Sequence, residues 1–142
     1  MADPEAVFRS FLHARRLKLT KERAAILRAA PRFNRPFEAE ELLIMLRELN
    51  ERVSKATVYR TLKHLVDAQL LKQVVFGANK QSHYEWAADG RGHDHLVDMD
   101  SGKIVPFNSA EIVRLRDEIA RSMGFSAVSH RFQIIGRRNA KP

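Results

Sequence analysis

Two histidines and three aspartates fall between Arg91 and Lys103, in the stretch "RGHDHLVDMDSGK". On a β-strand, His93 and His95 would point to one face and Asp94 to the opposite face. Imidazole nitrogens and carboxylate oxygens bind iron, manganese or zinc, so this pattern predicts a divalent metal site. The same residues are also compatible with two other readings. They could be polar surface residues of a sheet without a functional role, or the ligands of a metal-dependent hydrolase that uses His93, Asp94 and His95.

Further candidate ligands lie on neighbouring segments. Glu85 shares a strand face with His83 in "QSHYEWA", so either side chain could join His93 and His95 in one cluster. Asp94, on the other face of its strand, could meet His130. The residues alone therefore leave two candidate groups, which are His93 and His95 with Glu85 or His83, and Asp94 with His130.

The absence of cysteine limits the chemistry of the chain. It excludes disulfides, cysteine nucleophiles and a structural zinc site built from cysteines. No apolar run approaches the roughly 20 residues that cross a bilayer, and the first residues lack the apolar core of a signal peptide. We expect a cytoplasmic protein with no membrane partner.

The charge of the chain indicates a polyanionic partner. The net charge is +8 and the isoelectric point is about 10.3. Residues 1–86 hold 16 Lys and Arg against 10 Asp and Glu, whereas residues 87–142 hold 9 against 7. The first part therefore carries most of the positive charge that would attract nucleic acid.

Four helices are expected in the first part because apolar residues recur there at helical spacing. Pro4, Thr20, Pro36 and Ser54 stand where such helices would begin. In the fourth helix, "SKATVYRTLKHLVDAQL", the residues of the inward stripe are Val58, Leu62, Leu65 and Val66. The opposite side presents Lys55, Tyr59, Arg60, Lys63 and His64. Such a face is typical of a solvated helix and also of a DNA-recognition helix.

The fourth helix is followed by a predicted hairpin. The segments "LLKQVVF" and "QSHYEWA" read as strands, joined by the turn "GANK". Helices followed by a hairpin in this order indicate a winged helix-turn-helix. We predict an α+β fold, with a winged-helix DNA-binding domain over 1–86, a hinge over 87–92 and a small α/β dimerisation and metal-sensing domain over 93–142.

The second part is predicted to contain strands "HDHLVDM" and "IVPF" around the turn "DSGK", followed by a helix over about 109–123. Asn108 and Glu111 have the spacing of a capping box, and Gly124 favours a helix end. The alternation in "FSAVSHRFQIIGRR" predicts a long strand. Its shared face would carry Val128, His130, Phe132 and Ile134.

Three motifs, in this order, resemble the ferric uptake regulator (Fur) family of bacterial metal-responsive repressors. They are "RLKLTKERAAIL", "SKATVYRTLKHLVDAQLL" and "HDHLVDMDSGKIVPF", and the similarity extends from about Leu17 to Gly136. The resemblance implies a homodimer that binds a palindromic double-stranded DNA operator. By position it also implies that Tyr59 and Arg60 touch bases, Lys18 reaches a minor groove and Arg23 contacts phosphate. Lys55 and Lys63 complete the candidate DNA-binding set.

The chain departs from the metal sites that the resemblance implies. In the first cluster Pro36 and Pro106 replace a histidine and an acid, leaving Glu85, His93 and His95. In the second cluster Gly92 and Val113 replace a histidine and a glutamate, leaving Asp94 and His130. Asp98 and Ser101 stand where many relatives have zinc-binding cysteines. Replacement ligands such as Glu111, Asp98 or a group of the partner chain stay open.

We therefore expect a DNA-binding repressor rather than an enzyme, with iron, manganese or zinc bound at a His/Glu site. Haem as the effector and the complete loss of metal control stay open. The alternatives are the hydrolase described above and a protein-interaction module in which Tyr59 and Arg60 have no DNA to bind.

Overall fold

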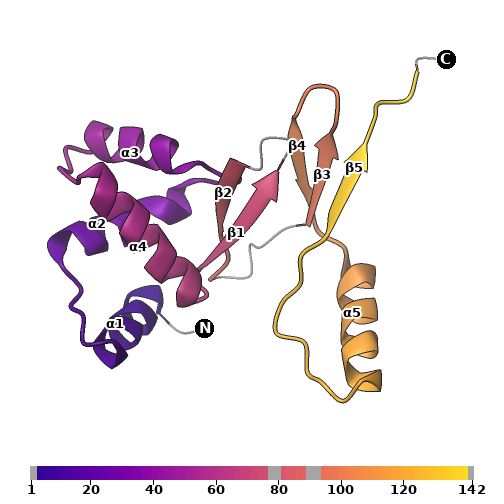
Figure 1. Ribbon diagram of the computed structural model, residues 1–142, viewed down its shortest axis with the longest axis horizontal. Coiled ribbons are helices and arrows are strands. Elements are labelled where there is room, and N and C mark those ends of the chain that lie inside the picture. The colour runs from indigo at the N-terminus through magenta and orange to yellow at the C-terminus, as the bar shows by residue number, and fades with distance from the viewer. Residues whose placement is uncertain (1–2, 77–80, 89–93, 141–142) are drawn as a thin grey trace. The chain divides into compact units, whose positions relative to one another are not determined.

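The computed structural model describes residues 3–76, 81–88 and 94–140. The chain divides into two compact units, Met1–Gly92 and His93–Pro142, each with its own sheet. The predicted turn at 77–80 and most of the predicted hinge at 87–92 lie outside the described residues. The structure is α+β, as the sequence predicts (Figure 1).

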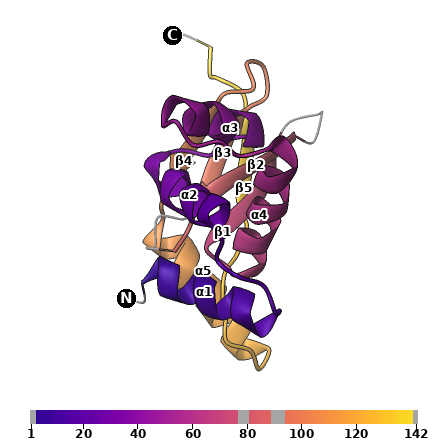
Figure 2. The same ribbon diagram turned by 90° about the vertical axis from the view of Figure 1, so that its left-hand side faces the viewer.

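Unit 1 contains the four expected helices, one 3-10 turn and the expected hairpin. The elements are α1 (Pro4–Ala14), α2 (Lys21–Ala29), η1 (Ala30–Arg32), α3 (Ala39–Glu48), α4 (Lys55–Asp67), β1 (Leu71–Phe76) and β2 (Gln81–Trp86). Helices α2, α3 and α4 pack against one another, as Figure 2 shows. This is the arrangement of a winged helix-turn-helix.

Side-chain caps fix where two of these helices begin. The Thr20 hydroxyl accepts a hydrogen bond from the Arg23 backbone N–H (3.2 Å), and the Ser54 hydroxyl accepts one from the Thr57 N–H (3.1 Å). Each bond satisfies a donor that the first turn of a helix leaves unpaired, and such a cap stabilises by about 1 kcal/mol. The cap at Ser54 sets the first residue of α4 and so the rotation of its outer face.

The core of unit 1 is apolar and continuous. Fully buried members from all four helices include Phe8, Leu12, Ile26, Leu42, Leu46, Val58, Leu62 and Leu65. Tyr84 and Trp86 of β2 extend this core under the hairpin. Burying each large side chain contributes roughly 1.5–3 kcal/mol, so this core positions α4.

The hairpin of unit 1 is anchored at its base. Strands β1 and β2 are antiparallel, with Leu71 opposite Trp86 and Lys72 opposite Glu85. On its other edge β2 pairs with Phe37, through two backbone hydrogen bonds between Phe37 and Tyr84 (2.9 and 2.8 Å). This single bridge fastens the chain just before α3 to the hairpin.

Unit 2 holds a three-stranded sheet and one helix. Its elements are β3 (Asp94–Asp98), β4 (Ile104–Phe107), α5 (Ala110–Ser122) and β5 (Gln133–Gly136). The strand order is β4-β3-β5, with β3 antiparallel to β4 and parallel to β5. None of the residues of α5, all of which are described, is buried.

Two predictions for unit 2 are wrong in detail. The last strand has only four residues, so Val128, His130 and Phe132 do not share a strand face. The reason is the parallel pairing with β3, which requires the chain to travel back along the unit before Gln133 can pair with His95. The N-cap of α5 is Ser109, whose hydroxyl accepts from the Ile112 N–H (3.3 Å), rather than Asn108.

No helix within the described segments is both long and apolar enough to cross a lipid bilayer.

Candidate nucleic-acid interface and metal ligands

The outer face of α4 is exposed where the sequence predicts it. The side chains of Lys55, Tyr59, Arg60 and Lys63 face solvent, and Tyr59 is 45% exposed despite its aromatic ring. His64 differs from this prediction because it is half-buried, with its ring edge against Phe11 of α1. The exposed face is therefore confined to the first two thirds of the helix.

Lys55, at the start of this face, is paired with an acid. Its ammonium lies 2.8 Å from the carboxylate of Glu40 in α3. The hydrogen bond and the charge of Glu40 raise the pKa of Lys55, so this lysine stays charged at neutral pH. Both side chains are more than half exposed, so the pair is accessible to a competing anion.

A hydrogen bond links Lys18, in the loop between α1 and α2, to Arg23, in the first turn of α2. The Arg23 guanidinium donates to the Lys18 carbonyl oxygen (2.6 Å), which ties the loop to the first turn of α2. Lys18 itself is exposed and Arg23 is half-buried. Arg23 thus positions the backbone of Lys18 and keeps further N–H groups for a ligand.

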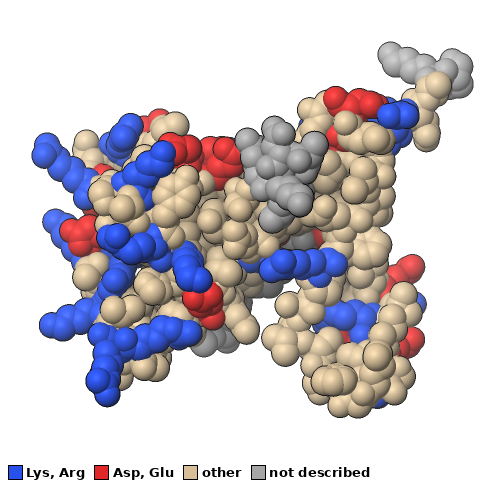
Figure 3. All heavy atoms as spheres, viewed as in Figure 1, with Lys and Arg blue, Asp and Glu red and all other residues tan. Residues whose placement is uncertain are grey.

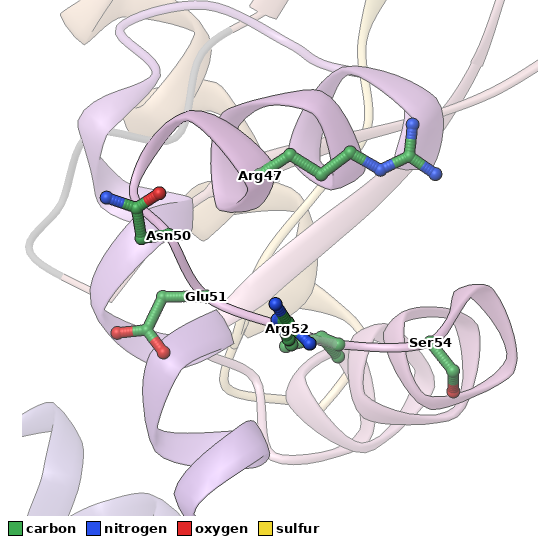
Figure 4. A pocket seen from close by; sticks show the side chains of 6 residues that line it. Arg47, Asn50, Glu51, Arg52 and Ser54 are labelled. Atoms are coloured by element: carbon green, nitrogen blue, oxygen red, sulfur yellow. The ribbon is translucent and has the colours of Figure 1, made fainter.

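A pocket that the sequence analysis missed lies between α3 and α4. It has a volume of about 680 Å³ and is lined by Arg47, Asn50, Glu51, Arg52, Val53 and Ser54. Figure 4 shows Arg52 on the connection that leads into α4, next to Ser54, with Arg47 on the last turn of α3. Helix periodicity gives no information about a connecting residue such as Arg52. The available signal was its position two residues before the N-cap.

Positive charge gathers on the surface of unit 1. Figure 3 shows Lys and Arg side chains over its helices, with few acidic groups among them. The helix N-terminus at Ser54 adds its own partial positive charge beside Arg52 and Lys55. An extended anion would meet cations from α2, α4 and the α3–α4 connection.

Unit 1 also carries the first candidate metal ligands. Glu85 is buried on β2, and His83 lies two residues earlier on the same strand face. The His83 Nε2 atom lies 3.4 Å from a carboxylate oxygen of Glu38. Close by in sequence, Arg35 makes a double hydrogen bond to Glu41, which lowers the pKa of that carboxyl.

The remaining candidates lie in unit 2. His95 is buried on β3, opposite Pro106 of β4, and His93 lies outside the described residues. Glu85 and the pair His93 and His95 therefore belong to different units. Among residues 3–76, 81–88 and 94–140, no three His, Asp or Glu side chains form a group that could hold a metal ion.

The predicted meeting of Asp94 with His130 is confirmed, with an addition. The His130 Nε2 atom lies 2.8 Å from the Asp94 carboxylate, and its Nδ1 atom lies 3.0 Å from the Arg116 guanidinium. Asp94 is buried, whereas His130 and Arg116 are partly exposed. Arg116 on α5 was not among the predicted residues.

The turn between β3 and β4 is held by hydrogen bonds where the resemblance implies zinc-binding cysteines. The Asp98 carboxylate accepts from the backbone N–H of Asp100 (3.0 Å) and Ser101 (3.4 Å), which lowers the pKa of Asp98. The Ser101 hydroxyl accepts from the Lys103 N–H (3.1 Å). These hydrogen bonds close the turn.

Comparison with known proteins agrees with this geometry. The model of the "Ferric uptake regulator family" matches residues 14–135. The ferric uptake regulation protein of Brucella abortus is 37% identical over 118 residues, covering 83% of this chain and 82% of that protein. The corresponding protein of Rhizobium leguminosarum is 32% identical over 136 residues, covering 96% and 94%.

A solved structure is also similar. The ferric uptake regulator from Pseudomonas aeruginosa with manganese has a TM-score of 0.80 at 32% identity, covering 92% of this chain and 97% of that chain. The likeness therefore extends over both units.

Proposed function

Because the chain belongs to the ferric uptake regulator family, whose members are transcription regulators and not enzymes, we propose that it represses genes by binding a palindromic operator as a metal-controlled homodimer. The observation that carries this proposal is the exposed basic and aromatic face of α4, on a helix whose position the core of unit 1 fixes. A regulator of genes works where the DNA is, so we propose a cytoplasmic location.

Residues of α4 read the bases in this proposal. Tyr59 and Arg60 lie on the exposed face within the first half of the helix, the part that approaches base edges in a winged helix-turn-helix. A guanidinium can donate two parallel hydrogen bonds to one guanine, and such a contact discriminates against the wrong base by about 1–3 kcal/mol. Lys55 and Lys63 flank this pair and bind phosphate.

Residues around α4 hold the DNA backbone. Lys18, with its loop tied down by Arg23, would enter a minor groove, and Arg52 beside the N-terminus of α4 would bind a phosphate. A plot of the logarithm of affinity against the logarithm of salt concentration has a negative slope. Each phosphate neutralised by a cation makes that slope steeper by about 0.9.

Unit 2 supplies the dimer interface. Exposed apolar side chains occur on α5 and on β5, which is an edge strand of its sheet. They include Leu115 and Ile119 of α5 and Ile134 and Ile135 of β5, and Met123 directly after α5 is also exposed. A large exposed apolar surface on a small unit indicates a protein partner, and a second copy of the same surface would cover it symmetrically. The two copies of α4 would then reach successive major grooves, roughly 34–36 Å apart or a multiple of that distance.

The residues of the first cluster fit a divalent ion in chemical type. Glu85 and His83 in unit 1, with Glu38 against His83, and His93 and His95 in unit 2 offer the oxygen and nitrogen donors that iron, manganese and zinc accept. An ion bound by both units would restrict how unit 1 is oriented on unit 2. Binding would shift the population toward the orientation that matches the operator. The relatives described above give no support for haem.

The hydrolase alternative is not favoured. Asp94, one of its three ligands, is buried and hydrogen-bonded to His130, and it faces the side of β3 opposite to His95. The basic surface of unit 1 would also have no role in such an enzyme.

The proposal is tested by mixing the purified protein with fragments of the source genome, with and without Mn²⁺, and sequencing what is retained. We expect a palindromic sequence that is enriched more strongly when Mn²⁺ is present. Arg60→Ala should weaken the preference for one base pair in each half-site, whereas Lys63→Ala should weaken binding to all fragments alike. Recovery of random fragments by the unmodified protein would contradict the proposal.

A further inference from the structure

The contact between Arg116, His130 and Asp94 lies wholly within unit 2 and joins three separate segments. Asp94 begins β3, Arg116 lies on α5, and His130 lies in the connection from α5 to β5. The distances are 3.0 Å from the Arg116 Nη1 atom to the His130 Nδ1 atom and 2.8 Å from His130 Nε2 to Asp94. The imidazole therefore bridges a guanidinium and a buried carboxylate.

The donor groups decide which ring nitrogen of His130 carries the hydrogen. A guanidinium can only donate hydrogen bonds, so the Nδ1 atom of His130 must accept. The ring hydrogen then sits on Nε2, where it donates to the Asp94 carboxylate. Both ring nitrogens are thus in use, in a neutral imidazole of defined tautomer.

The guanidinium of Arg116 opposes a metal ion at either ring nitrogen of His130. A divalent ion binds histidine through an unprotonated ring nitrogen, and Nδ1 already accepts from Arg116. An ion bound at Nε2, between His130 and Asp94, would move the ring hydrogen to Nδ1, where it would point at a guanidinium that can only donate. Arg116 is held in place from its other side, because its Nε and Nη2 atoms lie 3.1 and 3.0 Å from the Asp117 carboxylate. An ion at Nδ1 would have to displace a fixed positive charge, and an ion at Nε2 would leave two donors facing each other.

The sequence offers a reason for this arrangement. Val113 stands where the family resemblance implies an acidic ligand of the second metal cluster, and Arg116 follows it by one helical turn, on the same side of α5. The helix thus has valine in place of the implied acidic ligand and presents a positive charge to the same histidine. The remaining residues of that cluster do not fit a metal ion.

We propose that the Arg116 guanidinium is a built-in cation of unit 2 that replaces the metal ion of this cluster. It holds His130, and through it the connection before β5, against the buried Asp94. The folded form of unit 2 then needs no metal ion, and any metal control of this chain is confined to the Glu85, His93 and His95 set. This proposal does not depend on DNA binding.

The test uses nuclear magnetic resonance of the ring nitrogens in the ¹⁵N-labelled full chain, with His130→Gln to assign the signals. We expect His130 to show the Nε2-protonated neutral tautomer, and its ring signals to stay unchanged when Zn²⁺ is added in excess. Movement of either ring-nitrogen signal to the position of a metal-bound nitrogen in the unmodified protein would overturn the proposal. This measurement needs no variant of Arg116 and no DNA.

A charge-reversal pair tests the role of Arg116 itself. Arg116→Glu removes the cation and adds a carboxylate beside His130 and Asp94, so Zn²⁺ should now shift the His130 signals. Arg114→Glu makes the same change in charge at an exposed position of α5. In this variant the His130 ring signals should not change when Zn²⁺ is added. If Zn²⁺ does not shift the His130 ring signals in Arg116→Glu either, Arg116 does not exclude the ion and the proposal fails.

Discussion

At the scale of single residues, we expect the ion pair between Lys55 and Glu40 to oppose the proposed DNA binding. DNA phosphate must compete with the Glu40 carboxylate for the Lys55 ammonium, 2.8 Å away. We predict that Glu40→Gln raises affinity for the operator only about two- to fivefold, because an exposed ion pair is weak. The dependence of affinity on salt should become steeper by up to about 0.9 in log-log slope, because one more cation is available to phosphate. Fluorescence anisotropy over a range of salt concentrations measures both.

Glu48→Gln is the matched control for this prediction. Glu48 also lies on α3 and is exposed, so its substitution removes the same charge without freeing Lys55. A gain of equal size in both variants would mean that net charge alone sets the affinity and that the pair has no specific effect.

Functional residues could be predicted from the sequence where they lie on one face of a single helix. The outer face of α4 could be predicted because Lys55, Tyr59 and Lys63 recur along a single helix. The partners Glu40 and Arg116 could not, because they come from other elements and only the packing brings them to Lys55 and His130. Arg52 was missed because it lies on a connection without periodicity.

At the scale of elements, α1, α3, α4 and α5 end in the same hydrogen-bonded turn. In α4 the N–H of Leu70 donates to the Leu65 carbonyl (3.0 Å), and Gln69 donates to Val66 (2.9 Å), with Gln69 at a φ of 63°. This left-handed conformation favours glycine. Only α5 has glycine there, at Gly124, whereas α1 and α3 use Arg16 and Asn50.

We predict that Gln69→Gly stabilises unit 1. The substitution relieves about 1–2 kcal/mol of backbone strain and adds about 0.5–1 kcal/mol of chain entropy to the unfolded state, so a gain of up to ~1 kcal/mol should remain. Urea denaturation followed by circular dichroism measures it. Asp67→Gly, two residues earlier at the last position of the helix, should bring no such gain. Destabilisation by Gln69→Gly would contradict this account of the helix end.

The contact between α1 and α4 should depend on pH through His64. Burial, followed by the charge of Arg23, lowers the pKa of His64 below its usual value of about 6.5. The folded state thus favours the neutral ring. This contribution to stability is intact above pH 6.5 and is lost as the pH falls below that value, because the unfolded chain takes up the proton first.

Comparing the urea midpoint at pH 7.5 and at pH 5.5 tests this effect. The loss of stability on acidification should be smaller in His64→Gln than in the unmodified protein. His13→Gln, at an exposed position of α1, should lose as much as the unmodified protein. An equal loss in all three would exclude His64 as a source of the pH dependence.

The elements themselves were largely predictable, and the exception has a physical cause. Helix periodicity and cap residues located α1 to α4, since local sequence decides where a helix begins and ends. Alternation alone predicted a strand from Phe125 onward, yet a strand also needs a partner. In unit 2 the parallel pairing with β3 reaches only from Gln133 to Gly136.

At the scale of the whole molecule, the proposed dimer depends on the exposed apolar residues of unit 2. Leu115 on α5 is 56% exposed, and we predict that Leu115→Glu shifts the protein from dimer to monomer, because a buried unpaired charge is strongly unfavourable at an interface. Sedimentation velocity measures this shift. Ile44→Glu is the control, since Ile44 on α3 is 54% exposed but belongs to unit 1. A dimer that survives Leu115→Glu and dissociates in Ile44→Glu would place the interface in unit 1.

The central claim is that two copies of α4, held by a dimer, read a palindrome. The most direct measurement is the ratio of affinities for the selected operator and for a duplex of equal length with both half-sites shuffled, at about 0.15 M salt. We expect a ratio of at least about 10³, as sequence-specific regulators show. A ratio near one, with Mn²⁺ or without it, would contradict the claim.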